Sequence, residues 1–170
     1  MYIKLIGAGL IIAGCGGCGI RIAMLHRREV SALHQLVQVL DGMLCELEFR
    51  LTPLPELCRL GAEYAGGAIQ AFFLTLAEKM DSQLSPDVRQ CTIEALKQTK
   101  GLPAQAAEEL ETMGQTLGRF DLQGQINALR HCKQSCLNRL KALEHQQTER
   151  LRSYQTLGFC AGVALAILLF

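Results

Sequence analysis

The stretch that decides the fold is VSALHQLVQVLDGMLCELEFRLTPLP, residues 30–55. Thr52-Pro53-Leu54-Pro55 ends it, because each proline lacks a backbone donor and disfavours a helical backbone in the residue before it. Before this corner, apolar side chains recur every three or four residues, as on a helix with one apolar face. They are Leu33, Leu36, Val37, Leu40, Leu44, Leu47 and Leu51. The pattern predicts a long amphipathic helix that ends at a sharp corner.

Two shorter helices are predicted directly after the corner. The first starts near Pro55 and Glu56, with proline in its first turn, and runs to the Gly66-Gly67 break. The second runs from Ala68 to about Asp81. Its expected core stripe is Phe72, Phe73, Leu76 and Met80.

Two more short helices are predicted before the last one. Ser85-Pro86-Asp87 has the pattern of a helix start, with a cap, a first-turn proline and a first-turn acid. This helix should stop before Gly101, and its apolar residues are Val88, Cys91, Ile93, Ala95 and Leu96. Leu102-Pro103 opens the next helix, which should end near Leu117-Gly118.

The last helix is predicted to be long and capped by Asp121. It contains no Gly or Pro from Gln125 to Leu157, and if it continues to Phe170 it is about 70 Å long. Its apolar stripe is Ile126, Leu129, Cys132, Cys136, Leu140, Leu143 and Leu151. Because the connections are short, sequential helices should be antiparallel neighbours. The sequence therefore predicts an all-α antiparallel helical bundle.

Both ends of the chain are apolar. Residues 5–20 and 157–170 carry no charge, and six glycines within the first segment would let another helix approach closely in lipid. A helix over residues 3–20 is about 27 Å long, close to the thickness of a hydrocarbon core. We therefore expect three parts: an N-terminal membrane helix (1–20), a helical bundle (21–156), and a C-terminal helix that spans or enters the membrane (157–170).

The basic residues beside the apolar ends predict on which side the bundle lies. They are Arg21, Arg27, Arg28, Arg150 and Arg152. All five are on the bundle side, so the positive-inside rule places the bundle in the cytosol of a cell-membrane protein. One alternative stays open, because Ile12-Ala13-Gly14-Cys15 resembles a lipoprotein cleavage box. In that case the protein would be exported and lipidated at Cys15.

Charge and composition disfavour several classes of function. All 16 acidic residues and all but one of the 17 basic residues lie in the central region, which therefore has no net formal charge. Nucleic acid is thus not an expected partner. The four histidines are not placed with a nucleophile or with paired carboxylates in any pattern typical of catalysis. We predict a protein that is not an enzyme and has no catalytic residues, cofactor or metal.

Cysteines supply the main alternative. Cys15 and Cys18 have the spacing of a redox or metal-binding pair, but no preceding strand or second pair accompanies them. Cys132 and Cys136 are one helical turn apart and offer two metal ligands rather than four. Packing as small apolar residues is favoured for both pairs. A redox- or metal-binding membrane protein that uses these four cysteines remains the rival hypothesis.

Glutamates form two groups. Glu46, Glu48 and Glu56 lie near the proline corner, and a second group lies on the Ala-rich helix. The second group is Glu108, Glu109 and Glu111. A solvated face is the simpler interpretation, and a docking surface for a basic partner is the functional one.

Three segments, read together, resemble a known family. The first is the apolar start followed by arginines and the leucine-rich helix, and the second is Leu47-Glu48-Phe49-Arg50-Leu51-Thr52-Pro53-Leu54-Pro55-Glu56. The third is Leu117-Gly118-Arg119-Phe120-Asp121 with Gln125, followed by a long helix that ends in Leu157-Gly158 and an apolar tail. In order and spacing they resemble the stage III sporulation protein AB family, which is related to the F-type inner-membrane platform proteins of secretion machines. The Cys- and Gly-rich residues 14–19 depart from the family pattern.

The resemblance implies a function. It implies a component of the mother-cell membrane in the channel that joins mother cell and forespore. There the bundle would act as a platform that couples a cytosolic secretion-type ATPase to membrane ring proteins. Membrane lipid and other channel proteins would be further partners, and a homo-oligomer is compatible with this role. Thr52, Pro53, Leu54, Pro55, Gly118, Asp121 and Gln125 would then shape turns rather than contact ligands.

Overall fold

The computed structural model describes the backbone of residues 2–50, 52–82, 87–118 and 121–169, and the side chains of residues 24–50, 52–82, 87–118 and 121–145. Every regular element in these ranges is a helix, which confirms the all-α helical bundle. The helices are α1 (Tyr2–Arg50), α2 (Leu54–Glu63), α3 (Gly67–Asp81), α4 (Val88–Gln98), α5 (Ala104–Thr116) and α6 (Leu122–Leu169).

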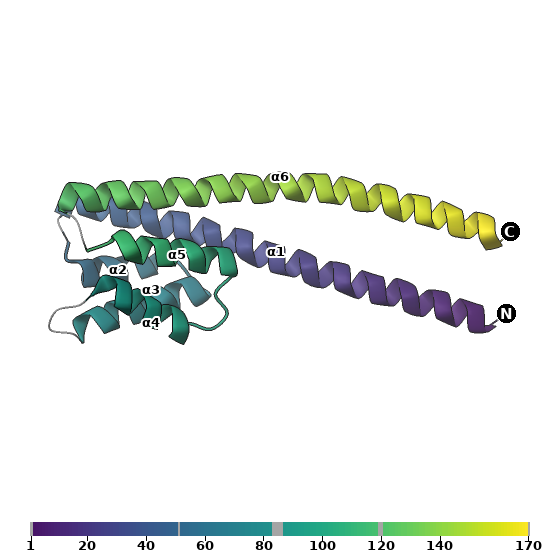
Figure 1. Cartoon of the computed structure of the whole chain (residues 1–170), viewed down its shortest axis with the longest axis horizontal. Helices are drawn as coiled ribbons and strands as arrows, with labels where there is room; N and C mark the ends of the chain where they lie inside the picture. The colour runs from purple at the N-terminus through teal and green to yellow at the C-terminus, as the bar shows by residue number, and fades with distance from the viewer. Residues whose placement is uncertain (1, 51, 83–86, 119–120, 170) are drawn as a thin grey trace.

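Two long helices give the molecule its shape. α1 and α6 contain 49 and 48 residues and pack against each other. They extend past the short helices in the same direction, so that both chain termini lie at one end of the molecule (Figure 1). The other end contains the proline corner after α1 and the turn before α6. Both terminal helices therefore leave the bundle from the same end.

α1 supplies the centre of the core. Of its predicted stripe Leu33, Leu36, Leu40, Leu44 and Leu47 are buried. Val37 is only half-buried, whereas Val39 and Met43 are fully buried, and Leu51 lies outside the described residues. The stripe is wider than predicted because α1 contacts α2, α3 and α5 as well as α6.

The short helices pack in chain order, each against the next, and α2, α3 and α5 contact α1 directly. Phe72 and Phe73 of α3 are fully buried, with ring centroids 5.3 Å apart in an edge-to-face arrangement. In α4, Val88, Cys91 and Ala95 are buried as predicted, but Ile93 and Leu96 are half-buried. The sixth helix buries the six predicted stripe residues that the structure describes, from Ile126 to Leu143.

The start of α4 differs from the prediction. Asp87 is itself the N-cap and accepts a hydrogen bond from the backbone N–H of Arg89 at 3.1 Å, instead of lying in the first turn. Ser85 and Pro86, which were expected to provide the cap and the first turn, lie outside the described residues. An Asp side chain caps a helix as well as a Ser side chain does, so either register satisfies the same orphan donors.

The turns at the corner end are formed as predicted. At the proline corner the carbonyl of Pro53 accepts the backbone N–H of Leu57 at 2.9 Å, and Pro55 lies in the first turn of α2. Before α6, Gly118 has a φ of 77°, which favours glycine. Asp121 then caps α6, because its Oδ1 accepts the N–H of Gly124 at 3.0 Å.

Side chains of α1 cap two of the short helices. The N-caps of α3 and α5 are Gly66 and Pro103, and neither supplies a side-chain hydrogen bond. Instead, Gln35 accepts the N–H of Gly66 at 2.9 Å. Glu29 accepts the N–H groups of Ala104 and Gln105 at 3.1 and 3.3 Å. These bonds fix the starts of α3 and α5 at defined levels along α1.

We expect Glu29→Ala to lower the free energy of unfolding by about 1–2 kcal/mol, because the first-turn donors of α5 lose an anionic cap. The measurement is urea unfolding of the full chain in detergent, followed by circular dichroism. Glu63→Ala is the control, since Glu63 is exposed and no described residue forms an ion pair with it. Equal stabilities of the two variants would contradict the capping role.

The side chains of the two expected membrane helices lie outside the described residues. Residues 2–20 and 157–169 belong to α1 and α6, but their side chains are not among those described. Among the described side chains, no helix offers a stretch long and apolar enough to cross a membrane.

Candidate functional site

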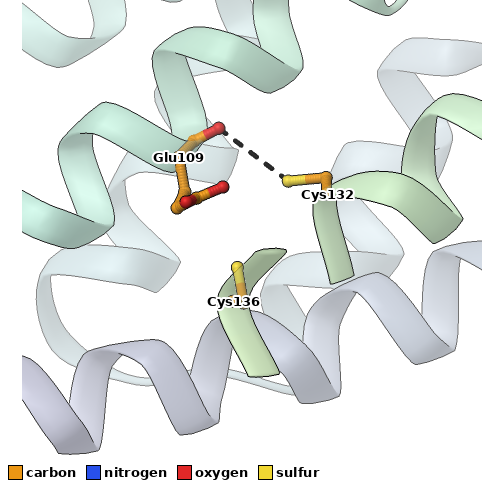
Figure 2. A group of neighbouring side chains, drawn as sticks. All are labelled: Glu109, Cys132 and Cys136. Atoms are coloured by element: carbon orange, nitrogen blue, oxygen red, sulfur yellow. Dashed lines mark hydrogen bonds between the residues drawn. The ribbon is translucent and has the colours of Figure 1, made fainter. Parts of the chain in front are cut away.

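Two thiols and a carboxylate meet between α5 and α6. Cys132 and Cys136 are buried on one face of α6 and point toward buried Glu109 of α5 (Figure 2). One potential ligand atom from each residue lies within 4.8 Å of the others. Among the described residues, these three side chains are the group whose potential ligand atoms lie close enough together to hold a metal ion. Glu109 was not predicted as a partner of these cysteines, because no spacing links residues 23 positions apart on different helices.

Two buried thiols, those of Cys132 and Cys58, are held in the neutral form. The Sγ of Cys132 donates to the backbone carbonyl of Glu109 at 3.8 Å. The hydrogen bond with Cys136 and burial raise the pKa of Cys132 far above the usual range of a thiol. Burial likewise raises the pKa of Cys58 in α2 to about 12. Neutral buried thiols pack as small apolar groups, and they would bind a metal only after losing their protons.

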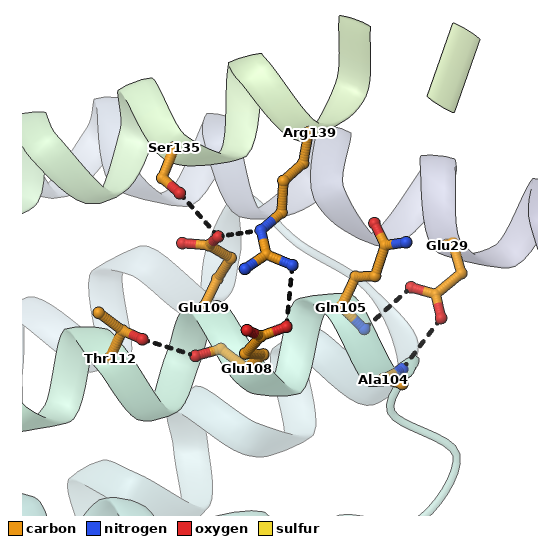
Figure 3. Close-up of polar contacts among 8 residues, drawn as sticks. All are labelled: Glu29, Ala104, Gln105, Glu108, Glu109, Thr112, Ser135 and Arg139. Carbon is orange, nitrogen blue, oxygen red and sulfur yellow. Dashed lines mark hydrogen bonds and ion pairs between the residues drawn. The ribbon is translucent and has the colours of Figure 1, made fainter. Parts of the chain in front are cut away.

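Arg139 of α6 holds two glutamates of α5. Its guanidinium forms an ion pair with Glu109 and another with Glu108 at 2.8 Å (Figure 3). Ser135 Oγ also donates to Glu109 at 2.8 Å. Ser135 and Arg139 are four residues apart and so share one face of α6, where they meet adjacent residues of α5. This network fastens the two helices with charge-assisted hydrogen bonds.

In this network a single cation, Arg139, is shared by two carboxylates. The hydrogen bond from Arg139 and its positive charge lower the pKa of Glu108. The hydrogen bond to Glu108 raises the pKa of Arg139, which therefore stays charged. The side chain of Glu109 is only 3% exposed, and its Oε1 accepts from both Ser135 and Arg139. Both glutamates are therefore committed to holding α5 against α6.

A pocket of about 470 Å³ lies beside the network. Thr112 and Met113 of α5 and His131, Ser135 and Arg139 of α6 are among the residues that line it. His131 is exposed, and it does not belong to the Glu109–Cys132–Cys136 group.

The other predicted glutamates lie at separate places. Near the proline corner, Glu48 forms an ion pair with Arg130 of α6 at 2.5 Å, and Glu46 accepts from Thr52 at 3.4 Å. Glu56 is exposed and pairs with Arg59 at 3.1 Å. Glu111 is exposed on α5. The two groups thus belong to different elements, and their role in docking a partner stays a prediction. Cys15 and Cys18 lie outside the described side chains.

Comparison with known proteins gives one consistent result. The family model of stage III sporulation protein AB matches residues 4–170. The chain is 25% identical to stage III sporulation protein AB of Bacillus subtilis (strain 168) over 173 residues, which covers 98% of this chain and 99% of that protein. A solved structure of stage III sporulation protein AB shares the fold, with a TM-score of 0.62 and 20% identity. The similarity covers 72% of this chain and 98% of that one.

Proposed function

The chain belongs to the stage III sporulation protein AB family, and we propose that it is a non-enzymatic platform in the mother-cell membrane. The platform would belong to a secretion-like channel between mother cell and forespore. The observation that carries the proposal is the arrangement of α1 and α6, which hold one bundle and place both termini at its same end (Figure 1). Such a molecule presents a rigid surface at a fixed distance from its anchors.

Membrane anchoring is part of this proposal. The uncharged residues 5–20 and 157–169 lie in α1 and α6, so each anchor continues directly into the bundle as helix. The C-terminal stretch is short, and Tyr154 would lie at the headgroup level. The five arginines beside the anchors would keep the bundle in the cytosol, as the positive-inside rule predicts.

The partner we propose is the cytosolic secretion-type ATPase that the family resemblance implies. Glu56 and Glu111 are exposed members of the two glutamate groups, and within the described part of the chain neither forms an ion pair with α6. They are therefore the better probes of docking, whereas Glu109 is buried. A contact there would transmit force through α5 and α2 to the two long helices.

Cross-linking in sporulating cells tests this role. A photoreactive residue at position 56 or 111 should capture the ATPase, and one in place of exposed Ala71 of α3 is the control. Capture from position 56 or 111, but not from 71, supports the platform. Absence of the ATPase from all products, or equal capture from all three positions, would overturn the coupling role.

A metal-binding protein is the second candidate, and the Glu109–Cys132–Cys136 group is what favours it. Alkylation of the folded full chain at pH 8, with peptide mapping, separates the two. Exposed Cys45 should react, whereas Cys58, with its raised pKa, should stay protonated and unmodified.

Zinc analysis of the same sample completes this prediction. The platform predicts unmodified Cys132 and Cys136 and no stoichiometric zinc. One zinc per chain that is lost in Cys132→Ser/Cys136→Ser would instead establish the metal site.

The raised pKa of Cys58 also predicts how the stability of the fold depends on pH. The folded thiol keeps its proton while the unfolded thiol ionises, so the stability that this group contributes is lost as pH rises from 9 toward 12.

A further inference from the structure

Position along α1 gives the distance from the proposed membrane surface. Each helical residue adds about 1.5 Å, so Glu29 lies about 14 Å from Ile20, the last residue of the apolar segment. Gln35 and Gly42 lie about 22 and 33 Å from it. Any element bonded to one of these residues has a known level along the axis.

The connection between α4 and α5 lies nearest the anchors. Glu29 binds the first two N–H groups of α5, so residues 99–103 are held at the level of residue 29 (Figure 3). The connection between α2 and α3 lies farther from the anchors, because Gly66 is bonded to Gln35 and the ring of Tyr64 lies beside Gly42. The α4–α5 connection is therefore the edge of the bundle that faces the anchored ends, as Figure 1 also shows.

This edge carries unpaired positive charge. Lys97 is exposed in the last turn of α4, and Lys100 is exposed within the connection. Arg27 and Arg28 are exposed on α1, about two helical turns after the apolar segment. No described carboxylate forms an ion pair with any of the four. Among the described side chains, Glu29 is an acidic residue at this level, and it is occupied by the N–H groups of α5. We call Arg27, Arg28, Lys97 and Lys100 the headgroup edge.

The distance suits lipid headgroups. The headgroup layer is roughly 5–8 Å thick on each side of the hydrocarbon core. The headgroup edge, about 11–14 Å from the core, is then within one Debye length, about 8 Å, of the charged surface. Cations at this distance are attracted to anionic lipids.

We propose that the headgroup edge contacts anionic phospholipid headgroups, so that Lys97 and Lys100 hold the bundle against the membrane at a third place besides its two anchors. The inference rests on the proposed anchoring and deepens it. Contact at three places would fix the tilt of the bundle, whereas two adjacent helices alone allow it to rock. The ligand class is an anionic phospholipid such as phosphatidylglycerol.

Hydrogen exchange in nanodiscs tests this contact. The full chain is placed in phosphatidylcholine alone or with added phosphatidylglycerol, and exchange is followed in the peptide that covers residues 99–103. Each lysine should favour the anionic surface about fivefold, so exchange should slow by up to about 25-fold with phosphatidylglycerol. Lys97→Gln/Lys100→Gln should remove this slowing, as should 1 M salt, where the Debye length is about 3 Å.

The matched control removes two exposed cations from the corner end. Arg50 ends α1, and Arg89 lies in the first turn of α4, the opposite end of the helix from Lys97. Arg50→Gln/Arg89→Gln should keep the slowing. Equal exchange in both lipids, or loss of the slowing in this control, would overturn the inference while the anchoring stands. A chain that does not enter the nanodisc would overturn the anchoring and this inference with it.

Discussion

Arg139→Met should be strongly destabilising, by about 3 kcal/mol. It removes the cation from Glu109, whose side chain is 3% exposed, and a buried carboxylate that keeps only the hydrogen bond from Ser135 is costly. This loss is at the low end of the losses expected when a buried ion pair is broken, because a third of the Arg139 side chain is exposed to solvent. Chemical unfolding of the full chain in detergent measures it.

Two further variants decide the cause of that loss. Glu109→Met/Arg139→Met replaces both charges by unbranched apolar side chains and should recover most of the stability. Arg130→Met breaks an ion pair in which both side chains are exposed, and should cost at most about 1 kcal/mol. A double variant as unstable as Arg139→Met would contradict the stranded-charge explanation.

Gly114→Ala should destabilise the bundle by about 2–3 kcal/mol. A Cβ on Gly114 would lie 2.3 Å from Oγ1 and 2.5 Å from Cβ of Thr92, so α4 and α5 would have to move apart. Thr92 is itself buried and bonded to the carbonyl of Val88, which leaves its side chain no room to turn away. Urea unfolding of the two proteins gives the difference.

Gly42→Ala is the control for this effect. Its Cβ would also meet a side chain, at 2.5 Å, but that side chain is the ring of Tyr64, which is 52% exposed and free to swing aside. Alanine also favours the helix by up to about 1 kcal/mol over glycine. We therefore expect Gly42→Ala to be neutral or stabilising. A loss as large as that of Gly114→Ala would show that helix spacing is not the cause.

Local sequence features predicted most of the fold. Helix periodicity and the breaks at Pro53, Gly66 and Gly118 are properties of neighbouring residues, and the structure places every helix close to the predicted range. The errors occur where several helices share one neighbour. Val39 and Met43 are buried because α1 is surrounded, a fact that a single amphipathic stripe does not contain.

The polar contacts between helices were less predictable. Glu29 and Gln35 look like surface residues in the sequence, yet they cap α5 and α3, 75 and 31 positions away. The sequence groups Glu109 with Glu108 and Glu111 as a candidate docking surface, but it is buried against α6. Its helical phase gives a weak signal, since Glu109 lies on the same face of α5 as buried Ala106 and Met113.

We propose that two terminal helices anchor one water-facing bundle on the cytosolic side of a membrane. Protease accessibility in sporulating cells tests it most directly. We predict that the bundle survives protease added outside intact protoplasts and is digested in inverted vesicles, where only fragments from the two apolar ends stay with the membrane. Digestion of the bundle from outside, or its release from the membrane as an intact chain, would contradict the account.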